Sequence, residues 1–94
     1  MDLYTIFLEF RGGTYIKQVR AKDLNEALDV WAKTIDVSEI AYFGKASQKQ
    51  LINQMPSCSD KEPTLINQCK NVWFTTASLT TGFGLINIVK TSEE

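Results

Sequence analysis

The fold of this chain is decided by the segment Asp23-Leu-Asn-Glu-Ala-Leu-Asp-Val-Trp-Ala-Lys-Thr-Ile35. At about 100° per residue, its apolar side chains fall into a single arc on one side of a helix. They are Leu24, Ala27, Leu28, Trp31 and Ile35. Asp23 and Glu26 have the spacing of a capping box, which satisfies free backbone N–H groups at a helix start. The segment therefore predicts an amphipathic helix, with Leu28 and Trp31 buried against another element.

Trp31 projects from the centre of this apolar stripe and admits two interpretations. Its indole can serve as a platform for a ligand, or it can anchor the core with its N–H near the rim. The second interpretation is favoured because large aromatic side chains dominate the energetics of protein cores. Val30 falls outside the stripe, so we expect its side chain to be half exposed.

A β-hairpin is predicted immediately before the helix. Residues 3–10 alternate in direction and have one firmly apolar face, and residues 14–20 form the returning strand. Between them, Gly12 and Gly13 suit a two-residue type I′ turn in which both residues have positive φ.

The predicted register of this hairpin places one charged residue on its apolar face. The predicted turn places Phe10 opposite Tyr15 and Leu8 opposite Lys17, so a cation lies on the apolar face. Either Lys17 extends to water at the edge of the sheet, or the loop is longer than two residues.

An apolar row lies on the other face of the hairpin, away from the helix. It consists of Leu3, Phe7 and Ile16. One helix cannot cover both faces, so the row predicts a contact surface for a second copy or for another protein. Symmetric dimers are the commonest oligomers, which favours a homodimer. The alternative is that residues 37–55 fold over this face and leave a monomer.

The segment after the helix begins with another capping-box pattern, Asp36-Val-Ser-Glu39. It predicts a short helical turn through Phe43 that ends at Gly44 in the left-handed conformation. In an alternative interpretation, residues 40–43 form a strand.

A third capping-box pattern, Ser47-Gln-Lys-Gln50, predicts one more short helix. This helix covers residues 48–55 and ends before a proline. Its inner face consists of Leu51, Ile52 and Met55.

The C-terminal part of the chain predicts a second hairpin. Residues 72–79 and 85–91 are rich in β-branched and apolar side chains, and residues 80–84 connect them. Phe83 lies in that connection, where its ring either anchors a partner or folds back onto the core. Residues 56–64 are polar and predict an exposed loop, used for recognition or simply as a connection.

Together these segments predict one small α+β domain over residues 1–94. The sheet is antiparallel, with about four strands from two β-hairpins in ββα…ββ order. The main helix packs across one face of this sheet, and short helical turns complete the chain.

The absence of histidine from the sequence excludes several kinds of chemistry. A Ser-His-Asp or Cys-His arrangement, a histidine general base and an imidazole zinc site are all impossible. We therefore expect no enzymatic activity, no cofactor and no metal. Bound zinc would require Cys58 and Cys69 together with ligands from a second chain. We expect both cysteines to be reduced thiols in a cytoplasmic protein.

The charge balance argues against a dedicated nucleic-acid binder. Ten basic residues nearly cancel eleven acidic ones, whereas proteins that bind phosphate backbones are usually strongly basic. Lys17, Arg20 and Lys22 nevertheless cluster near Tyr15, so weak binding of single strands by charge and stacking is the alternative function. Such charges more often protect a strand edge from association. No apolar run is long enough to span a membrane.

The N-terminal third of the chain carries Tyr4, the Gly12-Gly13 turn and Glu26-Ala27 early in the helix. In this outline it resembles the ββα opening of HicB-like antitoxin domains over about 35 residues. Those domains usually carry a segment with proline and glycine between strand and helix, whereas this chain has only Arg20-Ala-Lys-Asp23.

The sequence thus predicts a small non-enzymatic module that binds a protein, of the inhibitor, antitoxin or immunity type. The candidate partner contacts are Leu3, Phe7, Ile16 and Phe83. The partner is either a second copy of the chain or another protein, and nucleic acid is the less favoured alternative.

Overall fold

The computed structural model describes residues 1–55, 64–65 and 71–91. Over these ranges the chain has the predicted ββα…ββ order of an α+β domain. The elements are β1 (Asp2–Phe10), β2 (Gly13–Ala21), α1 (Leu24–Thr34), the short 3₁₀ helix η1 (Val37–Glu39), α2 (Gly44–Gln54), β3 (Thr64–Leu65), β4 (Val72–Leu79) and β5 (Gly82–Thr91).

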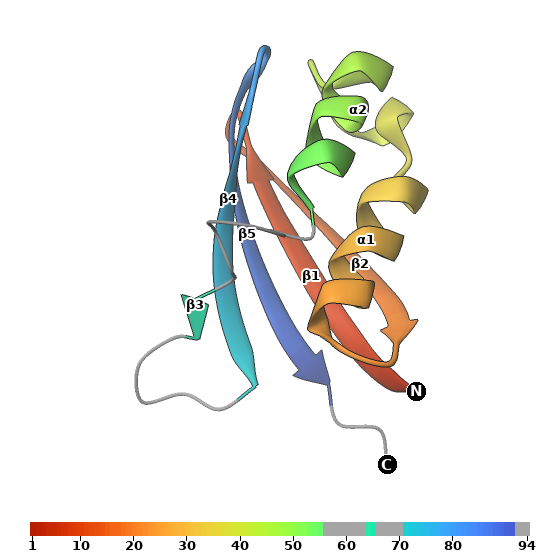
Figure 1. Ribbon diagram of the computed structural model, residues 1–94. Helices are drawn as coiled ribbons and strands as arrows, with labels where there is room; N and C mark the ends of the chain where they lie inside the picture. The colour runs from red at the N-terminus through yellow and green to blue at the C-terminus, as the bar shows by residue number, and fades with distance from the viewer. Residues whose placement is uncertain (56–63, 66–70, 92–94) are drawn as a thin grey trace.

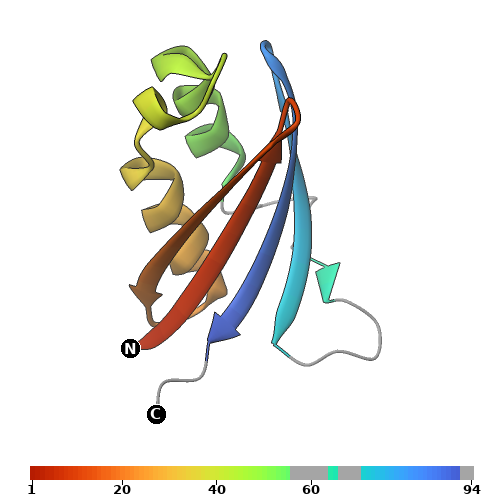
Figure 2. The ribbon, with the colours of Figure 1, turned by 180° about the vertical axis from the view of Figure 1, so that it is seen from behind.

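The strands form one antiparallel sheet in the order β2-β1-β5-β4-β3. The two predicted hairpins are therefore joined through β1 and β5, and the two-residue β3 pairs with β4 beyond them. Both α-helices lie on the same side of this sheet (Figures 1 and 2). The structure confirms an antiparallel sheet built from two hairpins with the main helix across one face.

The core fills the space between the sheet and the helices. The sheet contributes alternate residues of β1 and β5, which are Tyr4, Ile6, Leu8, Phe10, Ile86 and Ile88. Leu28 is fully buried and Trp31 is 1% exposed, as the periodicity of the segment predicts. Leu51 of α2 joins the same core. Trp31 is therefore a core anchor, and Val30 is half-buried at the margin of the stripe.

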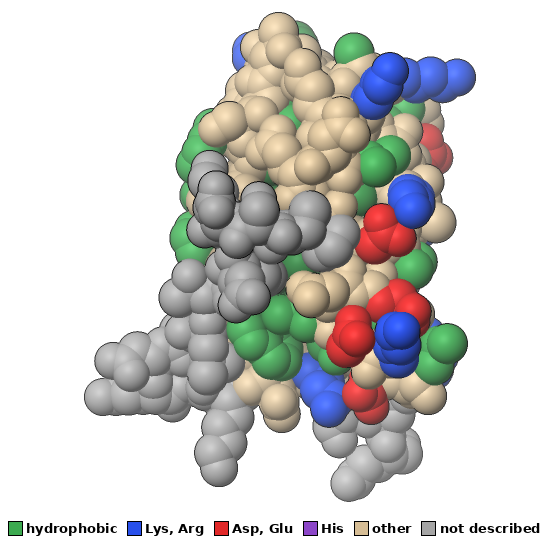
Figure 3. Space-filling model, viewed as in Figure 1, with side chains coloured by type: hydrophobic (Ala, Val, Ile, Leu, Met, Phe, Trp, Pro, Cys, Tyr) green, Lys and Arg blue, Asp and Glu red, His purple; other side chains and the backbone are tan. Residues whose placement is uncertain are grey.

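Helix α1 begins where its capping residues predict. The Asp23 carboxylate accepts a hydrogen bond from the Glu26 backbone N–H at 2.8 Å, and the Glu26 carboxylate accepts from the Lys22 N–H at 2.9 Å. On the outer face, Lys33 forms an ion pair with Asp29 at 3.0 Å. Acidic and basic side chains lie close together over α1 (Figure 3), so this helix presents a mixed, solvated surface.

The turn of the first hairpin is shifted from its prediction. Arg11 and Gly12 have positive φ (49° and 84°), whereas Gly13 already belongs to β2 and pairs with Phe10. The predicted positive φ at Gly13 is therefore wrong, and the register differs by two residues, so that Tyr15 lies opposite Leu8. Because two is a whole period of a strand, every side chain keeps its predicted face.

Two contacts explain why Arg11 accepts a turn position that favours glycine. Its guanidinium donates to the Thr81 carbonyl oxygen at 2.9 Å and lies 4.4 Å from the centre of the Tyr42 ring. Gly13 leaves room for a neighbouring side chain, since a Cβ there would lie 2.6 Å from the Tyr15 hydroxyl and the Tyr15 ring would have to move. Neither arrangement can be read from the dipeptide Gly12-Gly13 alone.

The segment after α1 follows the prediction only in part. Asp36 caps η1 by accepting from the Ser38 N–H at 3.0 Å, and residues 41–43 form a turn, so the strand alternative is wrong. Gly44 has the predicted positive φ (77°), but it begins α2 instead of ending the preceding turn.

Helix α2 begins four residues before the predicted start at residue 48. Ser47 therefore lies inside the helix and does not cap it; its hydroxyl is buried and shares a 2.6 Å hydrogen bond with that of Thr81. Leu51 and Met55 are buried and Ile52 is half-buried, which agrees with the predicted inner face.

The second hairpin closes more tightly than predicted. Leu79 pairs with Gly82, so Thr80 and Thr81 form the turn and Phe83 already lies in β5. Most of the predicted loop at residues 56–64 lies outside the described residues, as do Cys58 and Cys69.

Candidate protein interface

The sheet face that points away from the helices carries a row of four side chains across four strands, of which three are apolar. Pairing in register places Ile16 of β2, Phe7 of β1, Asn87 of β5 and Phe74 of β4 side by side. Both α-helices and η1 pack on the opposite face, so the alternative that residues 37–55 cover this row is wrong. We call this surface the open face.

The open face brings together the apolar residues predicted from the first hairpin. Leu3 and Phe7 are half-buried in it, and Ile16 is 61% exposed at its β2 margin. Phe83 is 55% exposed near the turn end of β5, so it neither covers the core nor joins the centre of the row. Its side chain shares the open face with the other three because it alternates with the buried Gly84.

Four further apolar residues on the open face were not predicted as contacts. They are Val72, Phe74, Leu85 and Val89, all half-buried. Their alternation in the sequence was visible, but the face to which each strand turns its odd or even residues depends on the pairing of β1 with β5. That pairing joins segments about 80 residues apart and has no local signal.

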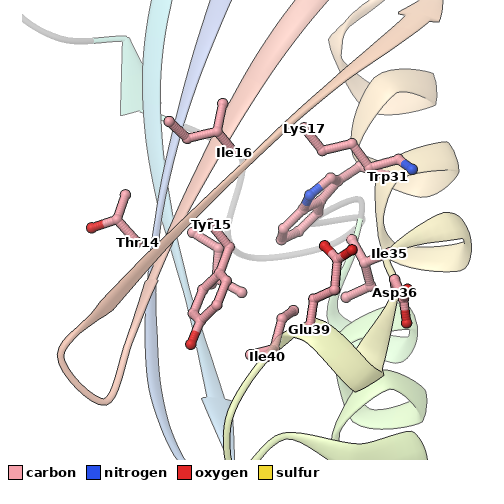
Figure 4. A pocket seen from close by; sticks show the side chains of 10 residues that line it. Thr14, Tyr15, Ile16, Lys17, Trp31, Ile35, Asp36, Glu39 and Ile40 are labelled. Carbon is pink, nitrogen blue, oxygen red and sulfur yellow. The ribbon is translucent and has the colours of Figure 1, made fainter.

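A groove of about 490 Å³ lies beside β2, the outer strand on this side of the sheet. One wall is the β2 segment 14–17, and the other is the junction of α1 and η1 (Figure 4). Trp31, Ile35 and Ile40 supply apolar surface inside the groove. The helix side of the groove therefore presents apolar side chains toward β2.

Polar groups line the same groove. The Lys17 ammonium donates to the Thr34 carbonyl oxygen at 3.3 Å, so Lys17 reaches the end of α1 across the sheet edge as one of the two predicted alternatives requires. Asp36 and Glu39 add two carboxylates from the helix side. Hydrogen bonds from the Ser38 hydroxyl and N–H, and then the charge of Lys17, lower the pKa of Asp36.

The predicted basic patch is not one surface. Lys17 pairs with Ile6 and points to the helix side, whereas Arg20 pairs with Leu3 and points to the open face. Lys22 lies in the connection to α1, where its N–H is bonded to Glu26. The three cations therefore do not form the common field that a nucleic-acid strand would follow.

The outer edge of β4 is closed by side chains of α2. Gln54 donates to the Ser78 carbonyl oxygen at 2.8 Å and accepts from the Ser78 N–H at 3.0 Å. Gln50 accepts from the Thr80 N–H at 2.8 Å. Farther along, Phe74 of β4 is paired with Thr64 of β3. The amide groups of the two glutamines thus occupy backbone positions where another strand would bond.

Within the described part of the chain, no three His, Cys, Asp or Glu side chains are grouped to hold a metal ion. A raised pKa occurs at Tyr4, where burial is the main cause and the nearby Asp2 carboxylate adds to it. Tyr4 belongs to the core and lies in β1, away from the groove carboxylates. The helices of the described residues are all too short or too polar to cross a membrane.

Comparison with known proteins adds no relative. No protein-family model matches the chain, no curated protein matches it, and no solved structure matches it. The resemblance to HicB-like domains therefore stays at the level of the ββα outline, and the surface of the molecule carries the functional argument.

Proposed function

We propose that this protein is a small non-enzymatic module that binds another protein through its open face, in the manner of an inhibitor, antitoxin or immunity protein. The observation that carries the proposal is the row of Ile16, Phe7 and Phe74, with Asn87 between the two phenylalanines, on the side of the sheet that the described helices leave uncovered. Apolar side chains that share an uncovered face are typical of interaction sites. A cytoplasmic location, with reduced cysteines, stays part of this proposal.

The distribution of ionisable groups supports binding over catalysis. Tyr4 and Asp36 have shifted pKa values, and each shift has a local cause, which is burial for the first and the Ser38 cap for the second. Catalytic groups usually work as pairs that shift each other within one cleft. The proposal therefore assigns no reaction to the groove.

The test is affinity capture from the source cell with variants of the open face. Leu3→Lys and Phe83→Lys place charges at the two ends of the face, and both positions are partly exposed, so the fold is retained. Asn53→Lys, on the exposed side of α2, is the matched control. Circular dichroism verifies that all variants are folded.

We expect a protein that is recovered with the parent chain and with Asn53→Lys, and that is depleted with both variants of the open face. Equal recovery with all variants would contradict a role for this face. Enrichment of nucleic acid that depends on Lys17 or Arg20 would instead support the alternative function.

A further inference from the structure

The outer edge of β2 carries backbone groups available for pairing. A two-residue turn closes with a hydrogen bond between its flanking residues, here Phe10 and Gly13. Bonded and non-bonded pairs then alternate along an antiparallel ladder. Thr14, Ile16 and Gln18 therefore turn their N–H and C=O groups outward, and no described residue supplies a backbone partner for them.

The side chain at the middle of this edge is unusual for an outer strand. Exposed edges normally carry charges or proline that oppose pairing with another chain, and Lys17 and Arg20 are charges of this kind on β2. Here Ile16 stands at the margin of the open face with 61% of its surface exposed. It also ends the apolar row formed with Phe7, so the row would continue if another strand were added beside β2.

We propose that the outer edge of β2 pairs with the same edge of a second copy of this chain, antiparallel and centred on Ile16. This goes beyond the proposed function, because it assigns a second copy as the partner of the β2 edge and leaves the open face to another protein. In that register Ile16 packs against Ile16 of the second copy on the open face. Its outward backbone groups form a bonded pair, as do those of Thr14 with Gln18 of the second copy.

The charges of the edge favour this register over its neighbours. Centring the pair on Lys17 would set two ammonium groups opposite each other, which is destabilising. Centring it on Gln18 would place Ile16 opposite Arg20 of the second copy. With Ile16 at the centre, Lys17 of the second copy lies opposite Tyr15, whose ring lines the groove.

The groove then receives a residue from each subunit. Glu39 lines the groove together with Tyr15, and its carboxylate forms no ion pair within the described part of the chain. Lys17 of the second copy, placed opposite Tyr15, brings its ammonium to the wall formed by Glu39 and Asp36. Its apolar stem passes over Ile40. Two-fold symmetry repeats the contact in the other groove.

The decisive experiment exchanges the charges between subunits. Light scattering after size exclusion should give the parent protein twice the chain mass of 10.6 kDa. Lys17→Glu and Glu39→Lys should each be monomeric alone, because each homodimer would face like charges twice. Mixed in equal amounts, the two variants should form a heterodimer, since both contacts then join opposite charges. Contacts within one chain cannot produce that recovery.

Ile16→Lys is the second variant, and Phe83→Lys is its control on the same face. We expect Ile16→Lys to raise the dimer dissociation constant about a hundredfold, as like charges meet at the symmetry axis. Phe83→Lys should leave it unchanged.

A parent protein that is monomeric at the highest concentration reached would overturn the pairing, and so would a mixture that stays monomeric. A dimer that survives Ile16→Lys and dissociates with Phe83→Lys would also overturn it. That last result would leave the open face as a protein-binding surface, so the two proposals fail separately.

Discussion

The two outer edges of this sheet differ in whether their outward backbone groups have hydrogen-bond partners. The β4 edge is paired with β3 at Phe74 and is capped by Gln54 and Gln50 at Ser78 and Thr80. The β2 edge has a groove beside it, and its outward groups meet no backbone partner among the described residues. An unpaired edge can accept another strand, so under the proposed pairing the closure of one edge would direct association to the other.

The difference arises from where each helix lies. Helix α2 packs against β4, close enough for neutral amide side chains to reach that edge. Helix α1 packs on β2, but its end and η1 stand apart from the strand and leave the groove. Side-chain amides of α2 thus form hydrogen bonds with the backbone at the β4 edge. Beside β2, the charged residues Lys17, Asp36 and Glu39 line the groove.

The largest expected effect tests the packing of Trp31 beneath the groove beside β2. Trp31→Ala removes a fully buried indole that supports both α1 and the groove, and it should lower the free energy of unfolding by about 3–5 kcal/mol. Chemical denaturation gives the value. The half-buried neighbour Val30, changed to alanine, should cost only about 1 kcal/mol. Equal, small losses would mean that α1 is not packed as described.

The next effect tests the closure of the β4 edge. The double variant Gln50→Ala and Gln54→Ala removes the side chains that bond Ser78 and Thr80. The loss of unfolding free energy should be about 1–3 kcal/mol, because these hydrogen bonds are partly exposed. Hydrogen exchange should show Ser78 and Thr80 losing protection. Asn53→Ala, on the exposed side of the same helix, should change neither quantity.

Opening the β4 edge should also change association. If the two edges differ only in closure, the double variant gains a second pairing edge, and light scattering should detect species larger than the parent protein. No change in mass, together with lost protection at Ser78, would show that closure does not decide which edge associates.

The features of this sheet that can be predicted from the sequence are those set by residues close together in the chain. The helix at residues 24–34 and the alternation of β1 were predictable because each is periodic over ten or so residues. The position of Leu3, Phe7 and Ile16 on one face of the sheet was predictable from the alternation of β1 and β2. Which strands become edges was not predictable, because the pairing of β1 with β5 joins distant segments.

The closure of β4 was missed for a related reason. Gln50 and Gln54 occupy the half-exposed side of a helix, where a polar residue is expected whatever its role. Their function appears only once α2 is placed beside Ser78. The start of α2 was also predicted too late, since Ser47 matches a cap in sequence but bonds Thr81 in the fold.

Ser47 provides the next prediction, because it ties α2 to the β4–β5 turn. Ser47→Ala leaves the Thr81 hydroxyl without its 2.6 Å partner in a place where Ser47 is 1% exposed. The expected loss of unfolding free energy is about 1–2 kcal/mol. Lys49→Ala, at an exposed position of α2, should lie within about 0.5 kcal/mol of the parent. Denaturation curves with the same result for both would contradict a structural role for this bond.

The smallest effect is a pH dependence. Lowering the pH should affect the β2 groove and leave the β4 edge unchanged, without any substitution. The caps of β4 are neutral amides, whereas the wall of the β2 groove includes Asp36, whose pKa is lowered by the Ser38 hydrogen bonds and by Lys17. The unfolded chain therefore takes up a proton at Asp36 at higher pH than the folded chain does. The stabilisation is complete above the usual aspartate pKa of about 3.9 and is lost as the pH falls through the lower, folded value.

An NMR titration can follow this loss at single amides. The Ser38 N–H, bonded to the Asp36 carboxylate at 3.0 Å, should shift as Asp36 takes up its proton, at a pH below the usual aspartate range. The Ser78 N–H, bonded to Gln54, has no such partner and should not follow that titration. Lys17→Met should move the Ser38 midpoint upward by part of its shift, since Lys17 is a lesser cause than Ser38. A Ser38 midpoint unchanged by Lys17→Met would show that the charge of Lys17 does not affect Asp36. It would also weaken the proposal that Lys17 contacts the groove of a second copy.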